Sequence, residues 1–218
     1  MSEAISIDVY SDVVCPWCYI GKRKLEQALM RLGEHNVAVT PSWRAFQLNP
    51  DMPSDGMVRK DYVESKFGGR ARATEIYARV AAVGNEVGIP FEFEKIERQP
   101  NTVPAHRLIR FAGEHGKQDA VAEALFKAFF LQFRDIGNVA ELSDIATAAG
   151  LDRDVVLSYL SSDRGAESVR QEDAVARQLG ITGVPFFVFA GKYAVSGAQG
   201  ADVLVQAYEQ AASETAMG

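Results

Sequence analysis

The sequence predicts an α/β fold, β-α-β … α-β-β-α, interrupted by a large all-helical insertion domain. A strand, a helix and a second strand are expected within the first 45 residues, and strand patterns are then scarce for more than a hundred residues. A hairpin pattern returns only near the C-terminus. We therefore expect one domain made of residues 1–48 and 165–218, and an inserted helical domain made of residues 49–164.

Composition and charge restrict the class of protein. The chain has 218 residues, of which 47% are hydrophobic and 24% charged, so it can bury a sizeable core. Its net charge of −6 argues against nucleic acid or an anionic membrane as the main partner. The N-terminus shows no basic leader, and Asp8 and Asp12 interrupt any signal-peptide core. We expect a cytoplasmic protein.

Local patterns predict the first strands and helix. Residues 4–10 alternate between apolar and polar side chains, which indicates a half-buried strand. Apolar residues then recur at helical spacing from Pro16 to about Gly33. Residues 37–44 have the composition of a second strand, in which Pro41 favours an edge position. Such a β-α-β unit implies parallel strands with a right-handed crossover.

Helical spacing continues through the expected insertion and then gives way to strand patterns. Apolar stripes predict helices at Ile76–Val87, Leu108–Ala112, Ala124–Leu131, Leu142–Ala149 and Leu151–Leu160. Beyond them, a helix around Val169–Leu179 precedes two apolar runs, at residues 184–189 and 193–196. A glycine-containing turn between the runs predicts a hairpin, and a last helix includes Leu204 and Tyr208.

The chemistry is expected at Cys15-Pro16-Trp17-Cys18, which contains the only two cysteines of the chain. Pro16 suits the first position of a helix, so Cys15 lies where free N–H groups and the helix dipole favour a thiolate. Cys18, one turn later, can reach Cys15 with a disulfide. We expect Cys15 to be an attacking thiolate open to solvent, and Cys18 to be its resolving partner.

Other interpretations of the pair are weaker. A zinc site would need two further ligands, and the three histidines (His35, His106 and His115) have no ligand spacing, so no metal is expected. A structural disulfide would close too short a loop to contribute much stability. Two inert, buried cysteines are an alternative, which the Pro-Trp insert at a strand-to-helix turn disfavours.

Two acidic residues are candidates for proton transfer. Asp12 lies close to Cys15 in the sequence, although a role as a loop or turn carboxylate is common for such a residue. Asp8 lies on the polar side of the first strand. If helices cover that side, Asp8 is the better candidate for a buried acid.

Four segments carry a resemblance to a known family. They are Ser11–Gly21, Asn101–Thr102 with Ala105–Leu108, Thr182–Val188 and Val195–Gln199. Together they resemble the DsbA-like branch of the thioredoxin fold, and more closely its cytoplasmic FrnE-type subgroup. The resemblance covers nearly the whole chain and implies a thioredoxin-like fold around the helical insertion.

The resemblance also implies further site residues. Pro185 would be cis and stand against the cysteine pair, and the Val184 backbone would bind an extended peptide or glutathione. Trp17 would offer an apolar contact, and Asn101 would line the groove. His106 would lie near the site, either as a proton-transfer group or as a hydrogen-bonded core histidine.

The function expected is a thiol–disulfide oxidoreductase of the protein disulfide isomerase or reductase type. No cofactor is expected, and glutathione is a candidate co-substrate. The partners would be disulfide-containing proteins or small thiols, with no nucleic acid and no membrane, and the chain would be a monomer or a homodimer. This chain has no second, C-terminal cysteine pair, so a relay through a second disulfide is excluded.

Two other function classes remain open. The fold also resembles kappa-class glutathione transferases and 2-hydroxychromene-2-carboxylate isomerases, in which a serine usually occupies the position of Cys15 and activates glutathione. The third class is a peptide-binding chaperone that uses an apolar groove beneath the insertion.

Overall fold

A four-stranded mixed sheet forms the base of the computed structural model, which describes residues 5–34 and 39–215. The strand order is β2-β1-β5-β6, with β1 at Ile7–Ser11, β2 at Ser42–Ala45, β5 at Phe186–Phe189 and β6 at Tyr193–Ser196. β1 runs parallel to β2 and antiparallel to β5, and β6 pairs with β5 as a hairpin. The α/β thioredoxin-like fold with a helical insertion is therefore confirmed.

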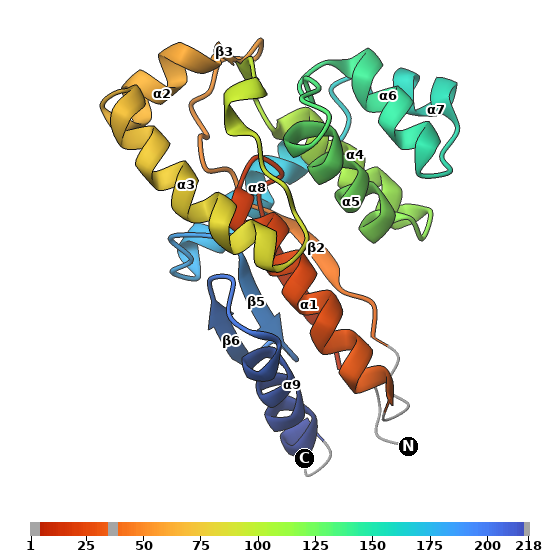
Figure 1. The fold of residues 1–218 in the computed structure, drawn as a ribbon. Helices are drawn as coiled ribbons and strands as arrows, with labels where there is room; N and C mark the ends of the chain where they lie inside the picture. The colour runs from red at the N-terminus through yellow and green to blue at the C-terminus, as the bar shows by residue number, and fades with distance from the viewer. Residues whose placement is uncertain (1–4, 35–38, 216–218) are drawn as a thin grey trace.

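Helices cover both faces of this sheet. The active-site helix α1 (Pro16–Glu34) and α9 (Ala201–Thr215) pack side by side on one face (Figure 1). Val9 and Phe187 point to that face, whereas their neighbours Tyr10 and Phe186 pack with Ala176 of α8. α8 (Ala166–Gln178) thus covers the opposite face, beside β2.

The insertion follows β2 and supplies most of the helices. They are α2 (Arg59–Phe67), α3 (Arg70–Glu86), α4 (Val103–Glu114), α5 (Gln118–Phe130), α6 (Val139–Ala148) and α7 (Arg153–Leu160). Figure 1 shows α2–α3 and α6–α7 on opposite sides of the region where α1 begins. Buried side chains from β1, α1, α4 and α5 form one continuous core, so the insertion packs directly on the sheet.

Three local details differ from the sequence predictions. The second strand is shorter than residues 37–44 and begins after Pro41, although it does lie at the sheet edge. The structure does not describe His35 or the first two residues, 37 and 38, of the predicted second strand. The insertion also contains a 3-10 turn, η1 (Phe93–Lys95), and a small antiparallel ladder, β3 (Met57–Val58) with β4 (Arg98–Gln99), whose two-residue strands give no alternating pattern.

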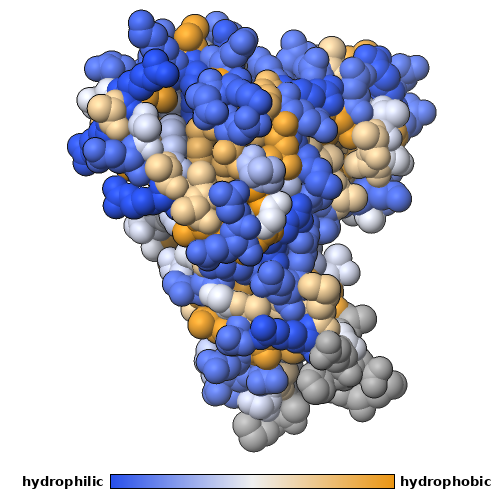
Figure 2. Space-filling model, viewed as in Figure 1, coloured by the Kyte–Doolittle hydropathy of each residue, from blue (hydrophilic) through white to orange (hydrophobic). Residues whose placement is uncertain are grey.

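The surface is mostly hydrophilic in the view of Figure 2, and apolar side chains gather near the junction of α3 with the start of α1. Of the helices within residues 5–34 and 39–215, none is both long and apolar enough to cross a membrane. In the same part of the chain, no group of three or more His, Cys, Asp or Glu side chains is arranged to hold a metal ion.

An ion cluster around buried Lys22 fixes α1 against the insertion, one turn beyond Cys18. The Lys22 side chain is only 2% exposed, and its Nζ lies 3.3 Å from Asp119 and 3.4 Å from Glu123 of α5, with Glu26 as a third partner. Burial alone lowers the pKa of Lys22, but the charges of these carboxylates outweigh it and raise that pKa above its ordinary value. Trp43 of β2 joins the cluster by donating to Asp119 at 3.0 Å.

We predict that Glu123→Gln lowers the free energy of unfolding at pH 7 by about 1–3 kcal/mol, because the buried Lys22 loses one of its carboxylate partners. Burial raises the pKa of Glu123, but the hydrogen bond from Arg23 and the charge of Lys22 leave it below its ordinary value of 4.5. This stabilisation is present above that pH and is lost as the pH falls through the lower, folded-state pKa. Urea unfolding from pH 7 down to pH ~3 measures both effects.

The matched control is Glu167→Gln on α8, because Glu167 is 72% exposed and its partners among the described residues, Arg170 and Gln171, are at the surface. This change should alter stability by less than about 0.5 kcal/mol. The stabilising role of the Lys22 cluster would be contradicted if both substitutions lowered the free energy of unfolding equally. It would also be contradicted if the loss caused by Glu123→Gln became larger at acidic pH.

Candidate active site

Cys15 caps the N-terminus of α1. Its backbone N–H donates to the Asp12 carbonyl at 2.9 Å, and its own carbonyl accepts from the N–H groups of Cys18 and Tyr19 at 3.0 and 3.3 Å. Pro16 is the first helical residue, where its missing N–H leaves no hydrogen bond unmade. The strand-to-helix turn predicted from the sequence is thus present.

The two cysteines are free thiols that face each other. Burial raises the pKa of Cys18 well above its ordinary value, and the neighbouring Cys15 adds to this increase. The Ser11 hydroxyl and the Asp12 backbone N–H act in the opposite direction, because both can donate toward the Cys18 sulfur. Cys18 therefore holds its proton at neutral pH and lies in a partly polar environment.

The expectation that Cys15 is open to solvent is wrong for this conformation, because the residue is only 3% exposed. Its thiol donates to the Val184 carbonyl at 3.5 Å. Tyr62 of α2 is a buried phenol whose pKa is raised by burial, which outweighs the lowering effects of Asn49 and Arg59, and the charges of Asp12 and Cys15 add to the increase. Trp17, the next side chain on the helix, is 39% exposed and marks the surface beside the pair.

The family resemblance implies that Pro185 stands against the cysteine pair, and the structure places its ring against Gly21 of α1, one turn beyond Cys18. The Val184–Pro185 peptide bond is cis. A Cβ on Gly21 would lie 2.8 Å from the Pro185 Cγ and 3.3 Å from the Phe187 ring, so only glycine allows this approach. On its other side, the Pro185 carbonyl accepts from the N–H of Gly197 at 2.8 Å. Gly197 has a φ of 81°, a conformation that favours glycine, which accounts for the glycine after β6.

The structure brings Asp12 and His106 together. Asp12 is fully buried, and its Oδ2 accepts from the Leu48 N–H at 2.8 Å. Its Oδ1 lies 3.4 Å from Nε2 of His106 on α4, which is also buried. Asp8 is instead partly exposed and accepts from Arg44 at 2.7 Å on the sheet face opposite α1. Asp12, and not Asp8, is therefore the buried acid near the cysteines.

Asn101 has a local structural role. Its amide donates to the Met52 carbonyl at 2.7 Å, and its Oδ1 accepts from the Val103 N–H at 2.9 Å. These bonds fix the loop after β2 to the start of α4. The prediction that Asn101 lines the binding groove stays a prediction.

Sequence reasoning missed two residues near the cysteines. Tyr62 lies on α2 and is the only residue of that helix that is buried in the structure. The sequence of α2 therefore shows no apolar stripe. Ser11 belongs to the segment that carries the family resemblance, but its position at the end of β1 gave no sign that its hydroxyl faces Cys18.

A family model described as a DSBA-like thioredoxin domain matches residues 6–209. The chain belongs to this family. An uncharacterized protein of Bacillus subtilis (strain 168), YwbO, is 30% identical over 204 residues, which are 93% of this chain and 95% of that protein. Membership agrees with the C-x-x-C pair at the start of α1 and with the cis-proline opposite it.

Solved structures give the same fold. A probable DsbA oxidoreductase from Streptomyces coelicolor superposes with a TM-score of 0.85 at 32% identity, over 95% of this chain and 89% of that one. A 2-hydroxychromene-2-carboxylate isomerase superposes with a TM-score of 0.72 at 17% identity, over 96% of this chain and 97% of that one. At that identity the second likeness concerns the fold alone.

We predict that Gly21→Ala destabilises the protein by about 1–2 kcal/mol, because an added methyl group would overlap the rigid Pro185 ring. Displacing Pro185 would also uncover Cys15, so its thiol should react faster with a maleimide. Thermal unfolding and timed labelling measure the two effects. Gly33→Ala is the control on the same helix, since an added Cβ there meets no described atom within 4 Å and should stabilise the helix by up to about 1 kcal/mol.

Proposed function

We propose that this DSBA-like protein is a thiol–disulfide oxidoreductase of the isomerase or reductase type, with Cys15 as the attacking thiolate and Cys18 as the resolving thiol. The observation that carries the proposal is the arrangement of two free, facing thiols at the start of α1, with the outer one against the Val184 carbonyl beside cis-Pro185. Family membership and the likeness to the Streptomyces protein support it.

The reaction would proceed by two thiol–disulfide exchanges. The Cys15 thiolate attacks one sulfur of a substrate disulfide, the substrate S–S bond breaks, and the released sulfur takes a proton. Cys18 then loses its proton and attacks the Cys15 sulfur, which forms the Cys15–Cys18 disulfide and releases the second substrate sulfur as a thiol. The substrate gains two electrons and the cysteine pair loses two, so an external thiol such as glutathione must reduce the pair again.

The burial of Cys15 requires that the substrate displace its cover. The contact with the Val184 carbonyl is a single weak hydrogen bond that the Cys15 thiol donates, and an incoming disulfide would replace it. The exposed Trp17 would provide apolar contact beside the attacked bond, and the Val184 backbone would pair with an extended peptide or with glutathione.

The finer parts of the proposal come from the sequence. We assign the chain to the FrnE-type subgroup and to the cytoplasm, with disulfide-containing proteins or small thiols as partners. We also propose that residues 1–48 and 165–218 form the thioredoxin-like domain and that residues 49–164 form the inserted helical domain. Glutathione would act as a co-substrate only.

We predict that Cys15→Ser lowers insulin reduction by at least about 100-fold, because the attacking sulfur is lost. Cys18→Ser should also stop turnover, but it should retain the first exchange and accumulate a mixed disulfide at Cys15. Turbidity of reduced insulin and intact-protein mass spectrometry after exposure to oxidised glutathione measure the two outcomes.

The two variants serve as controls for each other, since each removes one sulfur from the same site. Disulfide turnover that survives in Cys15→Ser would refute the proposal. Glutathione-dependent isomerisation of 2-hydroxychromene-2-carboxylate that persists in that variant would support the transferase or isomerase class instead. Suppression of client aggregation that is insensitive to alkylation of both cysteines would support the chaperone class.

A further inference from the structure

Three residues of α2 lie on one face of the helix. Arg59, Tyr62 and Lys66 are three and four residues apart, so they follow one another along the same side. Tyr62 is the only residue of α2 that is buried in the structure, and the charges of Asp12 and Cys15 act on it. The face that carries Arg59 and Lys66 is therefore the one that turns toward the cysteine site.

Arg59 has neutral partners only, within the part of the chain that the structure describes. Its guanidinium lies 5.1 Å from the ring centroid of Tyr62 and 5.4 Å from that of Tyr77. It donates to the Gln99 side-chain oxygen and, at 2.7 Å, to the Tyr77 hydroxyl. The Nε of Arg59 and the amide nitrogen of Gln99 are buried donors that reach no acceptor among the described atoms. Positive charge and donors in excess of acceptors favour an anion at this end of α2.

Lys66, at the other end of the same face, also has no acidic partner among the residues described. It is exposed, and its Nζ donates to the Asn49 Oδ1 at 3.3 Å. Asn49 directly follows Leu48, whose N–H donates to the buried Asp12 carboxylate at 2.8 Å. The ammonium group of Lys66 therefore lies beside the loop that Asp12 fixes, three residues before Cys15 in the sequence.

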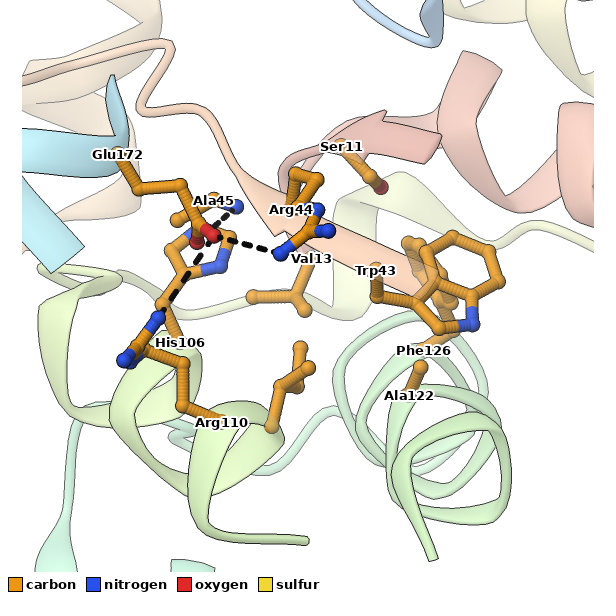
Figure 3. Close-up of a pocket in the computed structure, with 11 residues that line it drawn as sticks. Ser11, Val13, Trp43, Arg44, Ala45, His106, Arg110, Ala122, Phe126 and Glu172 are labelled. Carbon is orange, nitrogen blue, oxygen red and sulfur yellow. Dashed lines mark hydrogen bonds and ion pairs between the residues drawn. The ribbon is translucent and has the colours of Figure 1, made fainter. Parts of the chain in front are cut away.

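Two arginines elsewhere in the protein show the opposite arrangement. Figure 3 shows Glu172 of α8 between Arg44 of β2 and Arg110 of α4. Their guanidinium groups lie 3.5 and 3.7 Å from the Glu172 carboxylate, although the two arginine side chains are 41% and 39% exposed. Contact with water therefore does not by itself leave a cation of this protein without an acidic partner.

The charge of this part of the insertion also differs from that of the whole chain. The chain has a net charge of −6, whereas residues 59–79, from α2 into α3, contain six basic and three acidic residues. The two acids of α2, Asp61 and Glu64, are exposed. At about 100° per residue, both lie on the side of the helix opposite Arg59 and Lys66. The face toward the cysteine site is thus positively charged.

We propose that Arg59 and Lys66 bind acidic side chains that flank the disulfide of a peptide or protein substrate. The inference rests on the proposed function and gives its substrate class, acidic disulfides. The rise from Arg59 to Lys66 along α2 is about 10 Å, which equals about three residues of an extended chain. An extended segment that runs along α2 therefore presents one acidic side chain to each cation. The positive charge also raises the rate of encounter with such a substrate.

Three peptides that share one leaving group test this inference. The acidic peptide is acetyl-Ala-Glu-Cys-Ala-Glu-Ala-amide, and the other two have glutamine or lysine in place of both glutamates. The cysteine of each peptide carries a 4-thiopyridyl group. The Cys15 thiolate attacks the peptide sulfur, the bond between the two sulfurs of the probe breaks, and the leaving group takes a proton as 4-thiopyridone. Stopped-flow absorbance of 4-thiopyridone, at pH 7 and low salt, gives the second-order rate constant.

The wild-type protein should react about tenfold faster with the acidic peptide than with the glutamine peptide, and slowest with the lysine peptide. Two carboxylates gain cationic partners in the first case, and two ammonium groups are repelled in the last. About 0.5 M sodium chloride should reduce the tenfold preference to about twofold, because salt screens these charges. Equal rates with the three peptides overturn the inference and leave the proposed function intact. Absence of reaction with every peptide overturns the proposed function itself.

Arg59→Gln should slow the reaction with the acidic peptide about fivefold and Lys66→Gln about threefold, while the rate with the glutamine peptide stays within about twofold. A purely structural role would change both rates together.

Lys60→Gln is the matched control, because it removes the same charge from an exposed residue of the same helix. At about 100° per residue, Lys60 lies on the side of α2 opposite Tyr62. This variant should leave all three rates within about twofold. An effect of Lys60→Gln as large as those of Arg59→Gln and Lys66→Gln would reflect the overall charge of the helix and would overturn the inference.

A charge reversal gives a gain that a misfolded variant cannot produce. Lys66→Glu changes only an exposed side chain, and it should raise the rate with the lysine peptide by at least about threefold, because repulsion becomes attraction. The same substitution should lower the rate with the acidic peptide. A rate with the lysine peptide that is unchanged or lower overturns the inference, whether or not Arg59→Gln folds.

The mixed disulfide of glutathione with 4-thiopyridine separates the two sources of carboxylate. Slower reaction of Arg59→Gln and Lys66→Gln with the acidic peptide supports recognition of an acidic peptide segment. A loss confined to the glutathione probe, with unchanged rates for the acidic peptide, overturns the inference, because the cations would then serve the small co-substrate alone.

Discussion

The close approach of Pro185 to Gly21 is the contact on which the site depends. With no side chain at residue 21, the proline ring lies directly on α1, one turn beyond Cys18. This contact sets the Val184 carbonyl against the Cys15 thiol and places the start of β5 beside the start of α1. Residues that are 169 positions apart in the chain thereby form one site.

The two sulfurs of the cysteine pair have different environments, and neither is an exposed thiol. Cys15 is buried in the apolar core, and its thiol donates one hydrogen bond to the Val184 carbonyl beside Pro185. Cys18 is enclosed more completely, and burial raises its pKa.

The insertion completes the site as well as the core. α2 supplies Tyr62, and α4 supplies His106, while the ion cluster around Lys22 holds α1 against α5. The loop between β2 and α2 is fixed from both sides, by the Leu48 N–H on Asp12 and by the Met52 carbonyl on Asn101. Elements from the insertion and from the sheet thus surround the same two sulfurs.

The sequence by itself determined the order of elements, the parallel β1–β2 pair, the helix that begins at Pro16 and the nearness of the two cysteines. These depend on short-range periodicity, on helix-end preferences and on a three-residue spacing. Only the tertiary structure decided that Cys15 is covered, that Asp12 and not Asp8 is buried, and that Tyr62 and His106 lie near the pair. The physical reason is that burial and partner choice depend on how distant helices pack over a sheet face, and residue spacing along the chain carries no information about that packing.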